Sequence, residues 1–422
     1  MKNSPLYYTL GLFALLLTGM YSCKKVNGIN NNVVVETPYS LYFSDTAGTV
    51  YVSTDGKTAS IIFSADAKPC RSVITSASNI LFAKNNLYVS NNNGVNFNIT
   101  YDSLITSGEV DHNSAPGSPA PGAYAINGLP IDFNQTMLVN ISNWNNRVYA
   151  CTDHYLVSDT FNSLGLVHND LNGDLGAWYT EPFDTNSTSN PTVGPLPVRM
   201  TSLTQLTNGY VCGLAYGYNL GAPLRYVRNF YKPNQDLITK ANCWHEVTAN
   251  PDNVASIITY TINGSSTVTN NTYKPLPPYV GKPDSSFFTL GHYNNRLIAI
   301  DRKGEYGAWY SDDYGANWYQ YSGLPANTPL LCISSPFEQV CLIGTDSAGL
   351  YILNANTGVW QPNNNGVDRN LIVRNIAYKE TIYKNGTINQ YIYLATNKGI
   401  FQSIDGGHNW IMTIKGNYVS VY

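Results

Sequence analysis

Acidic side chains in this sequence recur directly after short apolar runs, in stretches typical of turns. Asp153, Asp301, Glu305 and Asp346 are the clearest cases. Two carboxylates at a set separation can cleave a glycosidic bond, one acting as the acid and the other as the base or nucleophile. These residues could supply such a pair, although no motif singles out one pair of them.

The same turns carry side chains suited to recognition rather than reaction. If the fold gathers the turns at one opening, they form a candidate binding site for a protein or a glycan. The alternative is that they are solvated turn residues, because Asp, Asn and Gly dominate such turns. Trp144, Trp178, Tyr179 and Trp309 either stack on sugars or pack as buried aromatics. The candidate ligand-binding residues are Asp153, His154, Tyr216, Tyr218, Asp301, Arg302, Glu305 and Asp346, with Asp45 and Lys398 in equivalent turns.

Several kinds of site are not expected. The histidines and cysteines show no HExxH or CxxC spacing, so no metal site is predicted. No glycine loop opens a helix to hold a phosphate, so no cofactor is predicted either. The formal net charge is -3 without a basic patch. That charge excludes nucleic acid as an expected partner.

The turns belong to a repeat that organises the chain. Two short apolar strands around a tight loop recur from positions 41, 80, 148, 210, 297, 341 and 392, with further apolar strands before and after them. This spacing predicts four-stranded antiparallel sheets and no helix. Seven such sheets arranged radially form a single β-propeller over 40–422, an all-β fold. The first unit lacks its first strand, and we expect residues 417–422 to supply it and close the ring.

One motif marks the turn between the third and fourth strands of a unit. It reads Ser-x-Asp-x-Gly-x-x-Trp, and its polar side chains can hydrogen-bond their own turn while the Trp is buried. Weaker copies are predicted at Ser53 with Asp55, at Ser90 with Asn92, Gly94 and Phe97, at Ser158, and at Gly358 with Trp360. The two complete copies are Ser311, Asp313, Gly315 and Trp318, and Ser403, Asp405, Gly407 and Trp410.

This motif resembles the Asp box, or BNR repeat, of sialidase-like propellers. That resemblance implies a structural role for the box, away from any catalytic centre. The phrase "ATNKGIFQSIDGGHNW" at 395–410 also resembles photosystem II assembly factors, whose family assists assembly without chemistry. Sialidase hallmarks are missing, because no Arg-Ile-Pro motif occurs and "PVRM" at 197–200 lies in the wrong unit. Xyloglucanase-like enzymes use a cleft between two propellers, whereas one propeller is expected here.

The N-terminus resembles a secretory signal that ends in a lipoprotein box. Residues 1–22 contain an apolar run, Cys23 is the expected lipidation site, and 23–39 form a linker. The alternatives are a cleaved signal with an incidental cysteine, or a membrane helix. The resemblance to Bacteroidota lipoproteins implies an outer-membrane protein facing the periplasm or the cell surface, in contact with the membrane only through its lipid.

The remaining cysteines are expected to be packed thiols, because most lie within apolar strands. Cys332 and Cys341 form the best candidate disulfide. Long segments at 102–136 and 250–286 are expected on the face opposite the Asp boxes, together with the candidate ligand-binding turns. The favoured hypothesis is a noncatalytic envelope lipoprotein that binds a protein or glycan, in an assembly or scaffold role. The alternative is a glycoside hydrolase.

Overall fold

The structure is a computed structural model in which the chain separates into two units. The first comprises Met1–Pro38 and Glu380–Asn389, and the second comprises Tyr39–Lys379 and Gln390–Tyr422. In the first unit, the amide of Gly386 donates to the carbonyl of Tyr383 at 2.8 Å and closes a turn. The structure describes residues 39–64, 68–84, 86–101, 137–141, 147–151, 163–169, 172–173, 178–182, 198–217, 224–232, 245–246, 257–260, 266–269, 276, 279–280, 288–337, 339–383 and 386–422.

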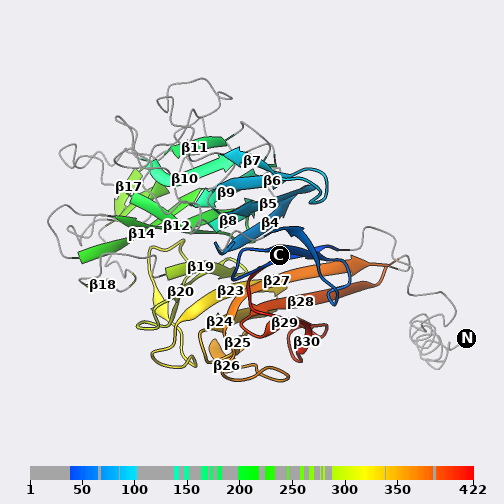
Figure 1. Ribbon diagram of the computed structural model, residues 1–422. Helices are drawn as coiled ribbons and strands as arrows, with labels where there is room; N and C mark the ends of the chain where they lie inside the picture. The colour runs from blue at the N-terminus through cyan, green and yellow to red at the C-terminus, as the bar shows by residue number, and fades with distance from the viewer. Residues whose placement is uncertain are drawn as a thin grey trace, which may run out of the picture. The chain divides into compact units, whose positions relative to one another are not determined.

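The described residues form antiparallel sheets of short strands and contain no helix (Figure 1). Three sheets come from the N-terminal part of the chain. The first contains β1 (Leu41–Asp45), β2 (Val50–Ser53), β3 (Ser60–Phe63) and β31 (Tyr418–Val421). The second contains β4 (Ser72–Ser76), β5 (Asn79–Ala83), β6 (Leu87–Ser90) and β7 (Asn98–Tyr101). The third contains β8 (Met137–Ile141), β9 (Arg147–Cys151), β10 (Ser163–Asn169) and β11 (Trp178–Pro182).

Four further sheets follow, together with one hairpin. The fourth contains β12 (Val198–Gln205), β13 (Val211–Gly217), β14 (Leu224–Lys232), β15 (His245–Glu246) and β18 (Tyr279–Val280). The hairpin consists of β16 (Ile257–Tyr260) and β17 (Ser266–Thr269). The fifth contains β19 (Phe288–Tyr293), β20 (Arg296–Asp301), β21 (Ala308–Ser311) and β22 (Tyr319–Gln320). The sixth contains β23 (Leu330–Phe337), β24 (Val340–Thr345), β25 (Leu350–Asn354) and β26 (Val359–Pro362). The seventh contains β27 (Val373–Ile382), β28 (Ile388–Thr396), β29 (Gly399–Ser403) and β30 (Ile411–Lys415).

This arrangement is an all-β propeller built from four-stranded antiparallel blades. The expectation of seven four-stranded blades is corrected: in the described part of the chain six sheets have four strands, and the fourth sheet has five because β18 pairs with β14. Segment 250–286 also contains the β16–β17 hairpin, where the sequence predicted only irregular structure. The alternating pattern of these two strands is short and lies within a long segment rich in Asn and Thr, so it did not predict a strand pair.

The third sheet departs from its predicted strands. Its third strand is β10, which pairs with β9 through Leu166 opposite Cys151, and not the stretch around Ser158. Ser158 lies outside the described residues. The turn after β10 instead begins at Asn169, whose side-chain oxygen accepts from the amide of Gly173 at 2.9 Å. Asn replaces the expected Ser, which is why the motif did not reveal this copy.

The C-terminal strand completes the first sheet, as the sequence predicted. β31 pairs antiparallel with β1, with Phe43 opposite Val421. Tyr42 and Tyr422 exchange two backbone hydrogen bonds of 2.8 and 2.7 Å. Tyr418 and Val421 are 6% and 2% exposed, so the strand also buries apolar side chains. The two ends of the second unit are therefore held in one sheet.

The tryptophans of the repeat pack between neighbouring sheets. Trp318, Trp360 and Trp410 are 1%, 1% and 3% exposed. Trp360 packs in one cluster with Ile298 of the fifth sheet and Ile343 of the sixth. Their indole nitrogens are buried without a hydrogen-bond partner. These side chains thus stabilise the sheet interfaces through apolar burial alone.

A second link between sheets follows the fourth strand and was not visible in the motif. The amide of Trp360 donates to Ser322 and that of Trp410 donates to Asn365, both at 3.0 Å. The next residues, Gly323 and Gly366, have φ angles of 90° and 88°. A Cβ at either position would lie 2.1 or 2.0 Å from the carbonyl oxygen of that Trp. Both positions therefore require glycine.

The described cysteines are free and buried, which corrects the proposed Cys332–Cys341 disulfide. Cys332 lies opposite Gly344 in the sheet, so the two cysteines do not face each other. Burial raises the pKa of both thiols to about 12. They behave as small apolar side chains, as most cysteines were expected to do.

Candidate functional site

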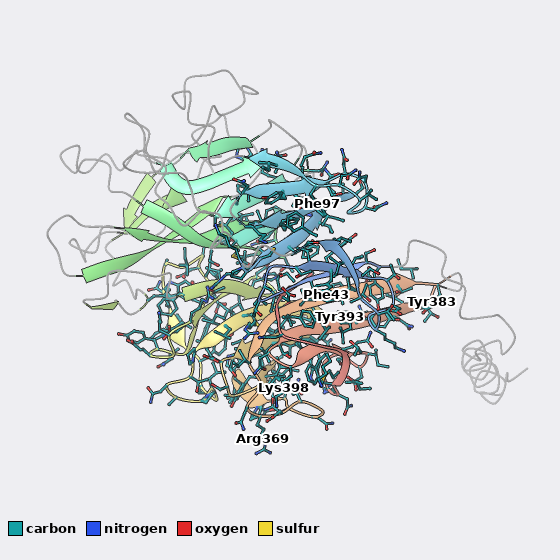
Figure 2. The ribbon with its side chains drawn as sticks, viewed as in Figure 1. Phe43, Phe97, Arg369, Tyr383, Tyr393 and Lys398 are labelled. Carbon is teal, nitrogen blue, oxygen red and sulfur yellow. The ribbon has the colours of Figure 1, made fainter. Side chains whose placement is uncertain are left out.

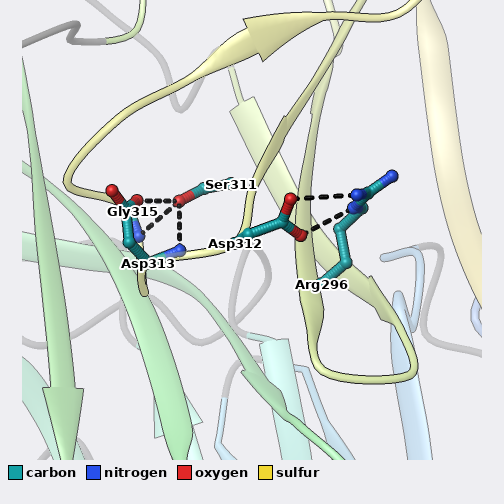
Figure 3. Close-up of polar contacts among 5 residues, drawn as sticks. All are labelled: Arg296, Ser311, Asp312, Asp313 and Gly315. Atoms are coloured by element: carbon teal, nitrogen blue, oxygen red, sulfur yellow. Dashed lines mark hydrogen bonds and ion pairs between the residues drawn. The ribbon is translucent and has the colours of Figure 1, made fainter.

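The Ser-x-Asp-x-Gly turns hold themselves together (Figure 3). Ser311 donates its hydroxyl to Asp313 at 2.7 Å and accepts the amide of Gly315 at 2.8 Å. Asp313 also accepts the amide of Asn317 at 2.8 Å. Gly315 has a φ of 100°, in the region that favours glycine. The neighbouring Asp312 forms an ion pair with Arg296 at 2.7 Å on the outside of the turn.

The second complete copy repeats this geometry. Ser403 donates to Asp405 at 2.8 Å and accepts the amide of Gly407 at 2.9 Å. Burial by itself would raise the pKa of Asp405, but the hydrogen bonds from Asn409, Ser403 and His408 outweigh this effect and lower the pKa to about 2. The weaker copy at Ser90 uses Asn92 in place of Asp, with the same Ser-to-side-chain bond at 2.9 Å. The carboxylates of these turns are engaged by their own backbone, so their role is structural.

The turns between second and third strands lie with the connections that enter the next sheet. The amide of Asp346 donates to Pro329 at 2.9 Å, and that of Gly349 donates to Leu371 at 3.2 Å. In the seventh sheet, the amide of Asn397 donates to Ile372 at 3.3 Å. These bonds place both kinds of loop at the same ends of the strands, as the topology predicted. We call this surface the loop face, defined by turns 45–50, 301–308, 345–350 and 396–399.

Asp301, the leading acidic candidate, is fully buried. Its two carboxylate oxygens accept the amides of Lys303 and Tyr306, each at 2.7 Å. Asp45 acts in the same way, accepting the amides of Ala47 and Thr49 at 2.9 Å. Both carboxylates brace their own turns. For these two residues, the interpretation as turn residues is therefore favoured over a catalytic one.

Threonines perform the same function in the sixth and seventh sheets. Thr345 accepts the amide of Ala348 at 3.0 Å, and Thr396 accepts the amide of Gly399 at 3.0 Å. The residue that ends the second strand thus caps the following turn, whether it carries a carboxylate or a hydroxyl. A neutral residue can take the position because the need is for a hydrogen-bond acceptor.

The other candidates occupy different settings. Arg302 and Glu305 are exposed, and Asp346 is half-buried. Lys398 is exposed and forms an ion pair with Asp368 at 2.7 Å, next to Arg369 in the chain (Figure 2). Tyr216 lies opposite Arg199 in the register of the fourth sheet. Asp153, His154, Tyr218, Trp144 and Cys23 lie outside the described residues.

The sequence analysis missed Arg374 at the start of β27. Its guanidinium donates to the side chain of Asn417 at 2.6 Å and to the carbonyl of Tyr418 at 2.9 Å. Burial lowers its pKa, Asp346 opposes that shift, and Arg71 adds to it. Asp346 and Arg71, from distant parts of the chain, therefore lie close enough to Arg374 to affect its pKa. The only sequence signal was an arginine at the start of a first strand.

A pocket of about 320 Å³ lies at the other ends of the strands, where first strands turn into second strands. Four successive sheets contribute to it: Thr207 follows β12, Asn294 follows β19, Phe337 ends β23, and Gln390 lies in β28. No sequence pattern predicted this pocket.

In the described part of the chain, no group of three or more His, Cys, Asp or Glu side chains is placed to hold a metal ion. Within the same residues, no helix has the length and apolar character needed to cross a membrane.

No protein-family model and no curated protein matches the chain. Among solved structures, YCF48 bound to a D1 peptide aligns with 88% of this chain and 91% of its own, at 11% identity and a TM-score of 0.43. A GH74 xyloglucanase from Xanthomonas campestris aligns with 88% of this chain and 58% of its own, at 12% identity and a TM-score of 0.41. A Hadza microbial sialidase aligns with 90% and 59%, at 9% identity and a TM-score of 0.35. The assignment of a β-propeller rests on the order and register of the strands within the sheets and not on these weak similarities.

Proposed function

We propose that this protein is a noncatalytic binding protein that holds a protein partner on its loop face. The observation that carries the proposal is that an Asp or Thr caps its own turn in each of the four turns that define the loop face. Asp45, Asp301, Thr345 and Thr396 fix the backbone of four turns in four sheets. A surface that is already ordered loses little conformational entropy when it binds.

The side chains displayed on these turns suit a protein partner. In the turns of the loop face, Arg302, Glu305 and Lys398 are exposed and Asp346 is half-buried. Charges of both signs give specificity and orientation to protein–protein contacts. A neutral glycan carries no charge that could form ion pairs with these side chains. A protein surface of complementary charge is therefore the better match.

The cellular setting is part of the same proposal. Residues 1–22 are taken as a signal peptide and Cys23 as a lipidated N-terminus, in an outer-membrane protein of the cell envelope. The phrase at 395–410 supports an assembly or scaffold role, since it resembles that of the photosystem II assembly factors. Labelling cells with radioactive palmitate tests the anchor: the wild type incorporates label and Cys23→Ser does not.

A crosslinking pulldown from solubilised envelopes tests the binding role. The double variant Arg302→Glu with Lys398→Glu reverses two exposed charges on the loop face, and we expect it to lose a partner that the wild type recovers stoichiometrically. Lys57→Glu is the matched control, because Lys57 is exposed on a turn between third and fourth strands, at the opposite ends. Equal recovery by the double variant and the wild type would contradict the proposal.

The alternative is hydrolysis of a glycan. Both oxygens of Asp301 are engaged by backbone amides, so Glu305 and Asp346 are the acids to test for such chemistry. Incubation with sialylated and neutral polysaccharides should release no reducing sugar and no sialic acid. Release that Glu305→Gln abolishes would replace the binding proposal with an enzymatic one.

A further inference from the structure

The pocket at the ends of the first strands has an aromatic wall. Phe337 in β23 and Tyr378 in β27 meet edge to face, with ring centroids 4.9 Å apart and an interplanar angle of 85°. Both side chains are half-buried, so each ring is held by its neighbours yet reaches the pocket. Because the two rings are nearly perpendicular, a ligand can lie flat on the face of one ring while the edge of the other ring borders it.

The rest of the lining is polar and uncharged. Thr207, Asn294 and Gln390 are exposed residues that line the pocket from three different sheets. Thr207 donates its hydroxyl to Asn295 at 2.6 Å, which leaves its oxygen able to accept. Asn and Gln each carry two donors and an acceptor. These groups match ligand hydroxyls, which also donate and accept.

The lining contains one histidine, His292. Burial lowers the pKa of His292, and its Nδ1 lies 2.9 Å from the hydroxyl of Thr204. Its backbone carbonyl accepts the hydroxyl of Ser335, which joins the fifth and sixth sheets beneath the pocket. The described lining therefore offers no full charge to pair with a phosphate, a carboxylate or a cation.

An apolar wall facing neutral amides and hydroxyls points to one chemical class. A pyranose ring has a face of C–H groups that can lie on an aromatic ring, and an edge of hydroxyls that pair with amides. The volume is near the lower end of the range for small-ligand sites. We propose that this pocket binds one or two sugar units of a neutral carbohydrate. The site is separate from the loop face and goes beyond the protein-binding role proposed above.

Binding to a panel of neutral trisaccharides tests this proposal on the full mature chain. Cellotriose, laminaritriose and mannotriose are titrated by calorimetry, and saturation-transfer NMR identifies the protons that contact protein. We expect saturable binding of at least one, with ring C–H protons most strongly saturated. Free N-acetylneuraminic acid and a Tyr-containing hexapeptide are the charged and peptide probes, and neither should bind at this site.

Two variants connect the binding to the pocket. Gln390→Ala removes an exposed amide, and we expect affinity to fall about 3- to 10-fold. Tyr378→Ala removes half of the aromatic wall, and we expect a fall of about 10-fold or more. Gln361→Ala is the control, because Gln361 is an exposed glutamine on outer strand β26. It should bind like the wild type.

Three results would overturn the proposal. The first is no saturable binding of any trisaccharide by the folded wild type. The second is binding that Gln390→Ala leaves unchanged. The third is binding of N-acetylneuraminic acid or the hexapeptide that Gln390→Ala weakens, which would make the site one for anions or peptides. Because Gln390 is exposed, loss of folding does not complicate this variant, and its melting temperature should equal that of the wild type.

Discussion

Removal of residues 417–422 should unfold the propeller as a whole. These residues supply strand β31 of the first sheet, although the rest of that sheet comes from residues 41–63. Deleting them exposes the edge of β1 and removes two side chains buried against it, Tyr418 and Val421. It also removes the two backbone hydrogen bonds between Tyr42 and Tyr422.

The structure allows the cost to be estimated. Two buried apolar side chains contribute about 1.5–3 kcal/mol each, and two hydrogen bonds about 1 kcal/mol each. The expected loss of about 5–8 kcal/mol is comparable to the whole stability of a typical domain, about 5–15 kcal/mol. The deleted chain should therefore be largely unfolded at 25 °C or melt far below the wild type.

Calorimetry and circular dichroism of the mature chain measure this loss. Two point variants separate the loss of the contacts of β31 from the shortening of the chain. Val421→Asp places a charge at a position that is 2% exposed and should reproduce most of the effect of the deletion. Ile411→Asp, on outer strand β30 at 69% exposure, should melt like the wild type. An unchanged melting temperature in the deleted chain would refute the assignment of β31 as the closing strand.

Three other perturbations test the links within and between sheets. Trp360→Ala should lower the free energy of unfolding, measured with urea, by about 3–5 kcal/mol. Trp360→Phe should lower it much less, because phenylalanine keeps an apolar ring and removes a buried donor that has no partner. Gly323→Ala should lower the free energy of unfolding by at least about 1–3 kcal/mol through its backbone angle alone, and further through the clash with Trp360. Gly358 has a φ of 69° but open space where a Cβ would lie, so Gly358→Ala should lose only the backbone contribution. The pKa of Asp405, lowered to about 2 in the folded state, means that its stabilising contribution is present above the unfolded pKa of about 3.9 and is lost as pH falls toward 2. Asp405→Asn should melt with less pH dependence between pH 4 and 2, since Asn92 closes the equivalent turn without a charge; an equal pH dependence in both proteins would contradict this role.

Strands and repeat turns were predictable because their determinants are local. The side-chain period of two identifies a strand, and the bonds that close the Ser-x-Asp-x-Gly turn join residues two and four positions apart, as from Ser311 to Asp313 and Gly315. The closing strand was predictable too, because the first unit lacked a strand and residues 417–422 formed an extra one. The prediction for the third sheet was wrong in detail, because Asn169 takes the place of the expected Ser and the motif is not recognisable there.

The candidate site was less predictable, because neighbours decide what a side chain does. Asp301 follows a strand as a catalytic or binding acid might, yet its own turn folds back and occupies both oxygens. Arg374 is part of no sequence motif. Its role is visible only because its guanidinium donates to Asn417 and Tyr418, which lie at the end of the chain.

The sequence by itself determined the class of fold, the short antiparallel strands, the turns that end the third strands and the return of the C-terminal strand to the first sheet. Each of these depends on residues that are close in sequence or on the count of strands. Only the tertiary structure decided which acids are occupied by their turns, which glycines must stay small and where the pocket lies. The pocket joins Thr207, Asn294, Phe337 and Gln390 across four sheets, and no pattern along the chain records a meeting of residues so far apart.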